Sequence, residues 1–320
     1  MDWVSVDTAI MFPGQGSQVV GMGREVAERS AAGRRVFERA DEVLGFSLSR
    51  ICFEGPESEL TRTDVQQPAI FVTSAAVWAT VLERGGSAQA LMGATAGLSL
   101  GEYTALYAAG ALSFEDGLRL VRRRGELMQE AADAVAGGMV SVIGGDEAAV
   151  RALCEAASQG EELGPANFNC PGQIVISGAI GGCERAVAMA AEHGVRAVML
   201  KVAGAFHSRL MAPAAEGLRE ELDKTVMKHP ACPVIANVDA QPHGEAAEIR
   251  RALCRQLTHP VRWRESMERL IGAGVRRFVE VGPGRVLTGL MRKIDRGVEA
   301  MSVGNLEEVE KFLDKSAVGR

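Results

Sequence analysis

Short apolar runs alternate with segments of helical periodicity along most of this chain. The apolar runs predict strands at 8–12, 90–96, 234–236 and 277–281. Between them, apolar residues recur with a helical period and predict helices at 33–44, 68–82, 100–109, 113–135, and from 209 and 245 onward. Strands that alternate with helices are typical of a parallel sheet covered by helices, so the pattern predicts an α/β fold.

The segment from about 137 to 202 has a different order of elements. It predicts strands at 139–143, 165–168, 173–177 and 195–202, with helices at 146–157 and 182–193. The order β-α-β-β-α-β is that of a ferredoxin-like unit. We therefore expect an α/β hydrolase-like large domain, residues 1–134 and 204–320, that carries an inserted ferredoxin-like small subdomain at 135–203.

Composition and charge narrow the classes of partner. The chain has 320 residues, 47% of them hydrophobic and 24% charged, which is ordinary for a globular protein. Its net charge of −6 argues against nucleic acid and against an anionic membrane surface, since both require a dense basic surface. A small molecule or another protein is the expected partner.

Neither a metal site nor a cofactor site is predicted. The six cysteines include no C-x-x-C pair, and the glycine motifs GQGSQVVGMG and GPGRVLTG lack the third glycine of a dinucleotide-binding loop. The sequence also contains no signal-peptide pattern and no long uncharged apolar run. We expect a cytoplasmic bacterial protein in a reducing compartment, or a plastid stromal protein if a transit peptide has been removed.

The pentapeptide Gly97-Leu98-Ser99-Leu100-Gly101 lies between a predicted strand and a predicted helix. This arrangement is the nucleophile elbow, in which a tight turn exposes a serine hydroxyl and leaves no room for side chains at the two glycines. The helix that follows offers unpaired N–H groups to a developing oxyanion. The alternative is a chance G-x-S-x-G, since the chain contains 37 glycines.

A serine hydroxyl needs a base to become a good nucleophile. Among the five histidines, His207 follows a predicted strand and precedes a helix, where α/β folds place functional residues. It is the candidate base, and the alternative is a packed core histidine. The other histidines stand next to prolines, in a turn or at a charged helix end.

Several further motifs carry a family resemblance. They are MFPGQGSQ at 11–18, GLSLGEYTAL at 97–106, VRRRGELMQEA at 121–131, GAFHSRLM at 204–211, RQLTHPVRW at 255–263 and EVGPGRVLTGL at 280–290. Together and in this order the chain resembles the malonyl-CoA:acyl carrier protein transacylases of type II fatty acid synthesis. The resemblance covers nearly the whole chain.

The resemblance implies a role for each matching residue. Ser99 resembles the nucleophile that carries the malonyl group as an ester, and His207 resembles the base that serves first Ser99 and then the phosphopantetheine thiol. Gln15 and the backbone N–H of Leu100 resemble the oxyanion hole, and Gln256 resembles a supporting glutamine. The family orients its histidine through a backbone carbonyl, so no aspartate is nominated.

Arg124 is the residue that points to malonate. A malonyl group carries a free carboxylate, and a guanidinium can hold a carboxylate through two parallel charge-assisted hydrogen bonds. Arg124 precedes Gly125 and matches the family's arginine, whereas Arg122 and Arg123 are expected on a solvated face. In related polyketide acyltransferases, a phenylalanine directly before the histidine accompanies specificity for malonyl, and Phe206 stands at that position here.

One position departs from the family pattern, because Leu98 stands where the usual elbow has histidine. Two alternatives to a transacylase therefore stay open. A serine hydrolase would share the elbow and the base but let water attack the acyl-enzyme, and a catalytically silent module would only bind the carrier protein.

Acyl carrier proteins of this family are strongly acidic, so Arg196, Lys201 and Arg209 are candidates for a basic docking patch. The family also implies a monomer.

Overall fold

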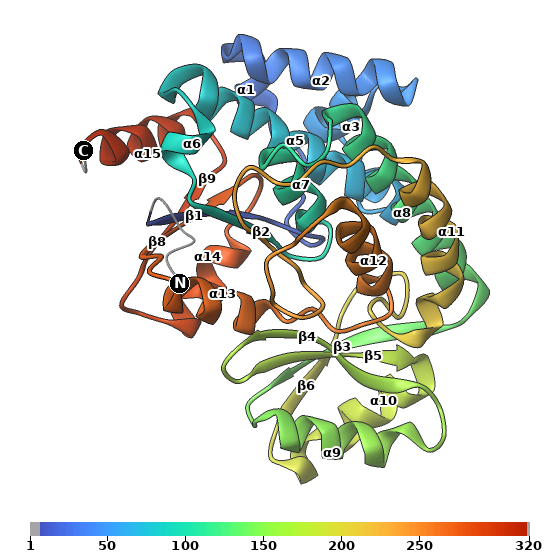
Figure 1. The fold of residues 1–320 in the computed structure, drawn as a ribbon. Helices are drawn as coiled ribbons and strands as arrows, with labels where there is room; N and C mark the ends of the chain where they lie inside the picture. Colours follow the sequence, from blue (N-terminus) through green and yellow to red (C-terminus); the bar gives the residue numbers. More distant parts are fainter. Residues whose placement is uncertain (1–6, 319–320) are drawn as a thin grey trace.

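The computed structural model describes residues 7–318 and contains two separate sheets. The first is a five-stranded, all-parallel sheet in the order β7-β2-β1-β8-β9, with helices packed around it (Figure 1). Its strands are β1 (Thr8–Phe12), β2 (Ala94–Gly97), β7 (Val234–Ile235), β8 (Arg277–Val281) and β9 (Glu299–Val303). The predicted α/β fold with a parallel sheet is confirmed.

The second sheet has four antiparallel strands in the order β4-β5-β3-β6. It belongs to one continuous segment at the bottom of Figure 1, residues 137–199, which we call the smaller unit; the rest of the described chain is the larger unit. The predicted order β-α-β-β-α-β is observed in the smaller unit. The elements are β3 (Gly137–Ile143), α9 (Glu147–Ser158), β4 (Leu163–Cys170), β5 (Gln173–Ala179), α10 (Ile180–Met189), the 3-10 turn η1 (Ala190–His193) and β6 (Arg196–Met199).

Helices form most of the rest of the described chain. Before the second sheet come α1 (Arg24–Arg29), α2 (Ala31–Leu44), α3 (Leu48–Glu54), α4 (Glu57–Leu60), α5 (Thr63–Gly85), α6 (Ala88–Leu91), α7 (Gly101–Ala108) and α8 (Phe114–Ala134). After it come η2 (Arg209–Met211), α11 (Ala212–Lys224), α12 (Ala246–Gln256), α13 (Trp263–Gly272), α14 (Val286–Ile294) and α15 (Leu306–Val318).

Strand β1 explains why the parallel sheet is buried on both faces. Successive side chains of a strand point to opposite faces, and all of β1 is buried. Ile10 and Phe12 pack into the larger apolar core, whereas Ala9 and Met11 pack into a second core with Trp263. A strand that is apolar apart from Thr8 is therefore required here, and the run at 8–12 was recognisable for that reason.

Helix α5 is the main core helix of the larger unit. It starts at Thr63 rather than at the expected position 68, with Pro68 inside it, and packs against α2 and α8. Within residues 7–318 it is the single helix with the length and apolarity to cross a membrane, and 89% of its most apolar window is buried inside the protein. Its hydrophobicity is thus accounted for by packing against neighbouring helices.

Two predicted strands differ in extent from those observed. The segment predicted as a strand from 90 begins with the helical turn α6, so β2 starts only at Ala94, and β6 is confined to Arg196–Met199. Strand β9 was not predicted. It is a half-buried edge strand, and its sequence EAMSV has no clear apolar alternation.

Backbone hydrogen bonds attach the second sheet to the segment that follows α12. The N–H of Val261, just after α12, donates to the carbonyl of Ala166 at 2.8 Å, and the N–H of Phe168 donates to the carbonyl of Val261 at 2.9 Å. A strand-like bridge therefore attaches β4 to the segment that follows α12. This attachment fixes one wall of the cleft described below.

Glu280 explains the EVGPGRVLTGL motif at 280–290. Its carboxylate is fully buried at the end of β8 and accepts from the backbone N–H groups of Leu287 and Thr288 at 3.0 and 2.8 Å. It also accepts from the Thr288 hydroxyl at 2.8 Å. The carboxylate thereby satisfies N–H groups at the start of α14 that have no partner within that helix.

We expect Glu280→Gln to lower the free energy of unfolding by about 1–3 kcal/mol. The amide NH₂ group that replaces one carboxylate oxygen cannot accept the hydrogen bonds from Leu287 or Thr288. Urea denaturation monitored by circular dichroism measures the change. Glu299→Gln is the matched control, since Glu299 forms half-exposed ion pairs with Arg277 and Lys315. An equal effect of the two substitutions would contradict the capping role of Glu280.

Candidate active site

The turn around Ser99 has the geometry predicted for a nucleophile elbow. Ser99 lies between β2 and α7 with a φ of 52°, a left-handed conformation that is unusual for a non-glycine residue. A Cβ added to Gly97 would lie 1.9 Å from the carbonyl oxygen of Gly101, and one added to Gly101 would lie 2.1 Å from that of Phe12. Both glycines are therefore required by close backbone packing.

His207 lies beside Ser99, and its imidazole bridges two groups. Its Nε2 is 2.8 Å from the Ser99 hydroxyl oxygen, and its Nδ1 is 2.7 Å from the backbone carbonyl oxygen of Gln256. A carbonyl oxygen only accepts, so Nδ1 carries the proton and Nε2 of the neutral ring is free to accept from Ser99. The structure thus gives a serine–histidine pair oriented by a backbone carbonyl.

Burial keeps this imidazole neutral. His207 is 5% exposed, and burial, followed by the nearby charge of Arg124, lowers its pKa from 6.5 to about 4. The hydrogen bond to the Gln256 carbonyl acts in the opposite direction. At neutral pH the ring is consequently in the form that can take a proton from Ser99.

Arg124, on α8, is fully buried next to this pair. Its Nη2 donates to the Ser99 hydroxyl oxygen and to Oε1 of Gln256, both at 2.9 Å, and its Nη1 donates to Oε1 of Gln67 at 2.6 Å. All three acceptors are neutral, and no carboxylate of residues 7–318 forms an ion pair with Arg124. A buried guanidinium without a counter-ion is costly and suits an anionic ligand.

The neighbouring arginines behave differently. Arg122 and Arg123 are 39% and 40% exposed at their side chains, and both pair with Glu126. Their position on a solvated face of α8 was predicted from the sequence. Burial lowers the pKa of Arg124. Burial also acts to lower the pKa of Arg123, but the hydrogen bonds and charges of Glu126 and Glu130 together outweigh it and raise that pKa.

Gln256, the last residue of α12, links several of these groups. Its Nε2 donates to the Ser99 carbonyl oxygen at 2.9 Å and to Oε2 of Glu102 at 2.6 Å. Its Oε1 accepts from Arg124, and its backbone carbonyl holds His207. Gln256 therefore contacts the serine, the histidine and the arginine together.

Three further residues of the site, Gln67, Asn237 and Glu102, were not predicted from the sequence. Asn237 accepts from the Ser99 N–H at 2.7 Å and donates to the Gly97 carbonyl at 2.8 Å, so it braces the elbow. A weak signal existed for each, because Gln67 and Glu102 interrupt apolar helices and Asn237 follows a strand at the same sheet edge as Ser99.

Gln15 and Leu100 follow the adjacent parallel strands β1 and β2, so both lie at the carboxyl edge of the sheet. Within residues 7–318 the backbone N–H groups of Gln15 and Leu100 have no hydrogen-bond acceptor. The Gln15 side chain donates to Oε1 of Gln66 at 2.6 Å. Two unpaired N–H groups at this edge are available to bind an oxyanion.

A cavity of about 320 Å³ reaches His207 from the surface. One wall belongs to the smaller unit and includes Arg151, Glu162 and Ser177, and the other includes Arg209 and His259. Its size falls within the range of about 300–1,000 Å³ that is usual for small-ligand pockets. Of the predicted docking residues, Arg209 lines this cavity, whereas Arg196 and Lys201 are exposed elsewhere.

The part of the chain that the structure describes contains no cluster of three or more His, Cys, Asp or Glu side chains that could hold a metal ion. All six cysteines are free thiols. Burial raises the pKa of Cys52 to about 12, so this thiol is protonated and unreactive at neutral pH.

Comparison with known proteins assigns the family. The model of the acyl transferase domain matches residues 10–312. A malonyl CoA-acyl carrier protein transacylase of Bacillus subtilis (strain 168) is 47% identical over 304 residues, which cover 94% of this chain and 95% of that protein. The chain belongs to the malonyl-CoA:acyl carrier protein transacylase family.

Solved structures of family members have the same fold. An acyl-carrier-protein S-malonyltransferase from Bartonella henselae superposes with a TM-score of 0.93 at 43% identity, covering 97% of this chain and 99% of that one. A malonyl-transacylase solved in complex with a type II polyketide synthase acyl carrier protein gives a TM-score of 0.93 at 40% identity, with 97% and 100% coverage. The family resemblance inferred from the motifs is confirmed.

We expect Gly97→Ala to lower the free energy of unfolding by about 1–3 kcal/mol or more, because its methyl group would overlap the Gly101 carbonyl. Thermal and urea denaturation measure the loss. Gly289→Ala is the control, because its added Cβ meets nothing within 4 Å. Alanine in the helix interior stabilises by up to about 1 kcal/mol relative to glycine. Equal stability of the two variants would refute the packing argument.

Proposed function

We propose that this protein transfers the malonyl group from malonyl-CoA to the phosphopantetheine thiol of acyl carrier protein, through a malonyl ester on Ser99. The observation that carries the proposal is the buried Arg124 guanidinium, which has only neutral partners and lies 2.9 Å from the Ser99 hydroxyl oxygen. The names of the family relatives and the carrier-protein complex of one of them support the same reaction.

In the first half-reaction, the Ser99 oxygen attacks the thioester carbonyl of malonyl-CoA, and its proton moves to Nε2 of His207. The carbonyl of Gln256 holds the opposite N–H of the resulting imidazolium. When the tetrahedral intermediate collapses, the carbon–sulfur bond breaks, and the coenzyme A sulfur takes the proton from Nε2. Malonyl-Ser99 and a neutral His207 remain.

The oxyanion of each tetrahedral intermediate would be bound by the N–H groups of Gln15 and Leu100. Leu100 stands at the N-terminus of α7, where the helix dipole also favours negative charge. Because these donors are fixed by backbone geometry, they need little reorganisation when charge develops on the carbonyl oxygen.

In the second half-reaction, His207 removes the proton from the phosphopantetheine thiol, and the thiolate attacks the malonyl ester. The Ser99 oxygen leaves and recovers its proton from Nε2, so the enzyme returns to its starting state. Throughout, Arg124 would hold the malonyl carboxylate with charge-assisted hydrogen bonds. Pinning this carboxylate fixes the reacting carbonyl over Ser99.

We further propose the finer classification of the fold. The large unit, residues 1–134 and 204–320, is α/β hydrolase-like, and residues 135–203 form a ferredoxin-like subdomain. The strand order β4-β5-β3-β6 with antiparallel neighbours supports the second assignment, and the serine elbow after a parallel strand supports the first.

The carrier protein is expected to approach the cavity that contains His207. Arg151 and Arg209 line this cavity and could meet an acidic partner, despite the net charge of −6 of the whole chain. That the protein is a monomer remains a prediction from the family. Its location in the bacterial cytoplasm, or in the plastid stroma if a transit peptide has been removed, remains a prediction from the sequence.

The proposed function predicts a malonyl adduct on Ser99 in intact-protein mass spectrometry after mixing with malonyl-CoA. Arg124→Met should slow its formation about a hundredfold or more, because charge-assisted bonds to the malonyl carboxylate are lost while methionine fills much of the space. Acetyl-CoA, which has no carboxylate, should be slow with both proteins. Arg123→Met, from the solvated face of the same helix, is the control and should leave the rate unchanged.

Addition of phosphopantetheinylated carrier protein should remove the adduct and yield malonyl carrier protein. Ser99→Ala should form no adduct. Steady release of coenzyme A without carrier protein would favour a serine hydrolase instead, and absence of any adduct with either thioester would favour a silent binding module. Unchanged labelling of Arg124→Met would refute the role of Arg124.

The acidic limb of the pH profile should reflect the lowered pKa of His207. Only the neutral ring can accept a proton, so kcat/KM for acylation by acetyl-CoA should stay constant from about pH 8 to pH 5 and fall as the pH approaches about 4. Arg124→Met removes a positive charge that disfavours the imidazolium, and the limb should move toward higher pH. A wild-type limb centred near 6.5 would contradict the effect of burial.

A further inference from the structure

A buried hydrogen bond between a histidine and a carboxylate lies behind the active site and has no part in the mechanism above. Nε2 of His243 lies 2.7 Å from Oε1 of Glu102, and their side chains are 2% and 1% exposed. His243 belongs to the loop between β7 and α12, and Glu102 lies in the first turn of α7, directly after the elbow. A buried carboxylate is costly unless its oxygens are well hydrogen-bonded.

Glu102 meets this requirement through donors from separate parts of the chain. Oε1 accepts from Nε2 of His243. Oε2 accepts from Nε2 of Gln256 at 2.6 Å and from the backbone N–H of Asn237 at 3.2 Å. The carboxylate can only accept, so each of its neighbours must present an N–H to it.

This requirement determines which way the Gln256 side chain faces. Its NH₂ group points to Glu102 and the Ser99 carbonyl, which leaves the amide oxygen to accept from Nη2 of Arg124. A reversed amide would place its oxygen against the carboxylate and its NH₂ against the guanidinium. Both contacts would be repulsive, so Glu102 sets the orientation of the amide.

Glu102 also influences Arg124 through its charge. The two side chains form no ion pair, yet the negative charge of Glu102 raises the pKa of Arg124 against the larger, opposite effect of burial. Gln256 separates the two charges, which keeps the donors of Arg124 free of a carboxylate partner. The negative charge of Glu102 thus favours the charged form of Arg124, while the N–H groups of Arg124 remain free of a carboxylate acceptor within residues 7–318.

We propose that His243 and Glu102 form a positioning pair that fixes the Gln256 amide and, through it, aims Arg124 at the acyl group. This inference rests on the proposed function, because the group that Arg124 would hold is the malonyl carboxylate. The pair thereby favours malonyl over acyl groups that lack a carboxylate. Neither His243 nor Glu102 touches the substrate.

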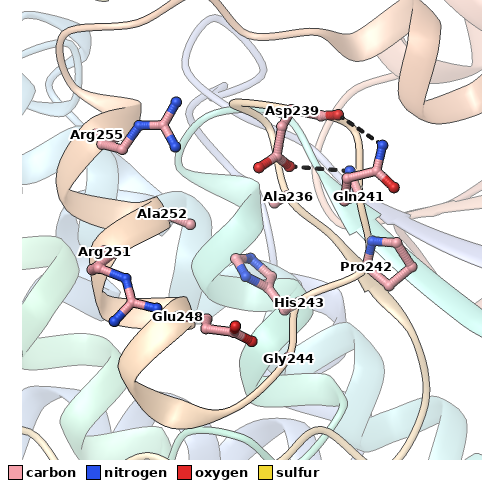
Figure 2. Close-up of a pocket in the computed structure, with 10 residues that line it drawn as sticks. All are labelled: Ala236, Asp239, Gln241, Pro242, His243, Gly244, Glu248, Arg251, Ala252 and Arg255. Atoms are coloured by element: carbon pink, nitrogen blue, oxygen red, sulfur yellow. Dashed lines mark hydrogen bonds between the residues drawn. The ribbon is translucent and has the colours of Figure 1, made fainter.

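His243 is open to substitution because a cavity of about 280 Å³ adjoins its ring (Figure 2). Figure 2 shows the ring between α12, which carries Arg251 and Arg255, and the loop that carries Asp239 and Gln241. A side chain of similar length can therefore replace histidine without meeting a tightly packed core.

Two amide substitutions separate hydrogen bonding from polarity. In His243→Gln the side-chain nitrogen can take the place of Nε2 and donate to Glu102. In His243→Asn the shorter side chain places its nitrogen near the site of Nδ1, out of reach of the carboxylate. His229→Asn is a control on an exposed histidine, which is 64% exposed at its side chain.

The experiment measures kcat and KM for acylation by malonyl-CoA and by acetyl-CoA in each variant, together with the melting temperature. We expect His243→Asn to lower kcat/KM for malonyl-CoA about tenfold, as loss of a hydrogen bond to a buried charged group implies. Acetyl-CoA should change less than about threefold, since it makes no use of Arg124. His243→Gln and His229→Asn should keep the malonyl-to-acetyl ratio of the wild type.

An unchanged malonyl-to-acetyl ratio of kcat/KM in His243→Asn would overturn the inference, whether both values fall equally or neither changes. So would a lowered ratio in His243→Gln, which remains decisive if His243→Asn does not fold. A wild-type protein that forms malonyl-Ser99 while these variants keep its selectivity would leave the proposed function intact and reject only the positioning pair. A wild type that forms no malonyl ester would reject both.

Discussion

The site is organised around one electrostatic constraint, the placement of a positive charge inside the protein without a negative partner in contact. Arg124 is held by the amide oxygens of Gln67 and Gln256 and by the Ser99 hydroxyl, all of them neutral. Neutral dipoles stabilise the guanidinium without cancelling its charge. A carboxylate in direct contact would stabilise the arginine more and would compete with an anionic substrate for the same N–H groups.

The same charge also affects the proposed base. Arg124 disfavours a second positive charge nearby and, after burial, is the next largest cause of the lowered pKa of His207. Acylation would bring a malonyl carboxylate next to Arg124, which would offset this repulsion when the imidazolium forms. Recognition of the acyl group and proton transfer are therefore coupled electrostatically, even though Arg124 and His207 act on different atoms.

Local patterns of the sequence predicted the parts of the site that follow from local geometry. The strand, the two glycines and the helix around Ser99 could be recognised because steric packing demands them, and His207 because it follows a strand. Gln67, Asn237 and Glu102 could not be placed, since their partners lie far away in the sequence. Strand β9 was missed for a related reason, because its half-buried position leaves no regular apolar alternation.

The segment from Gln256 to Val261 connects the proposed base, His207, with the sheet that forms one wall of the cleft. At its start, the Gln256 carbonyl orients His207, and at its end Val261 pairs with β4 of the smaller unit. His207 itself follows β6, on the opposite edge of that same sheet. The smaller unit is thus attached close to both partners of the His207–Gln256 hydrogen bond. A displacement of this unit would alter the cleft and the orientation of the imidazole together, which explains why the two-sheet architecture is part of the site.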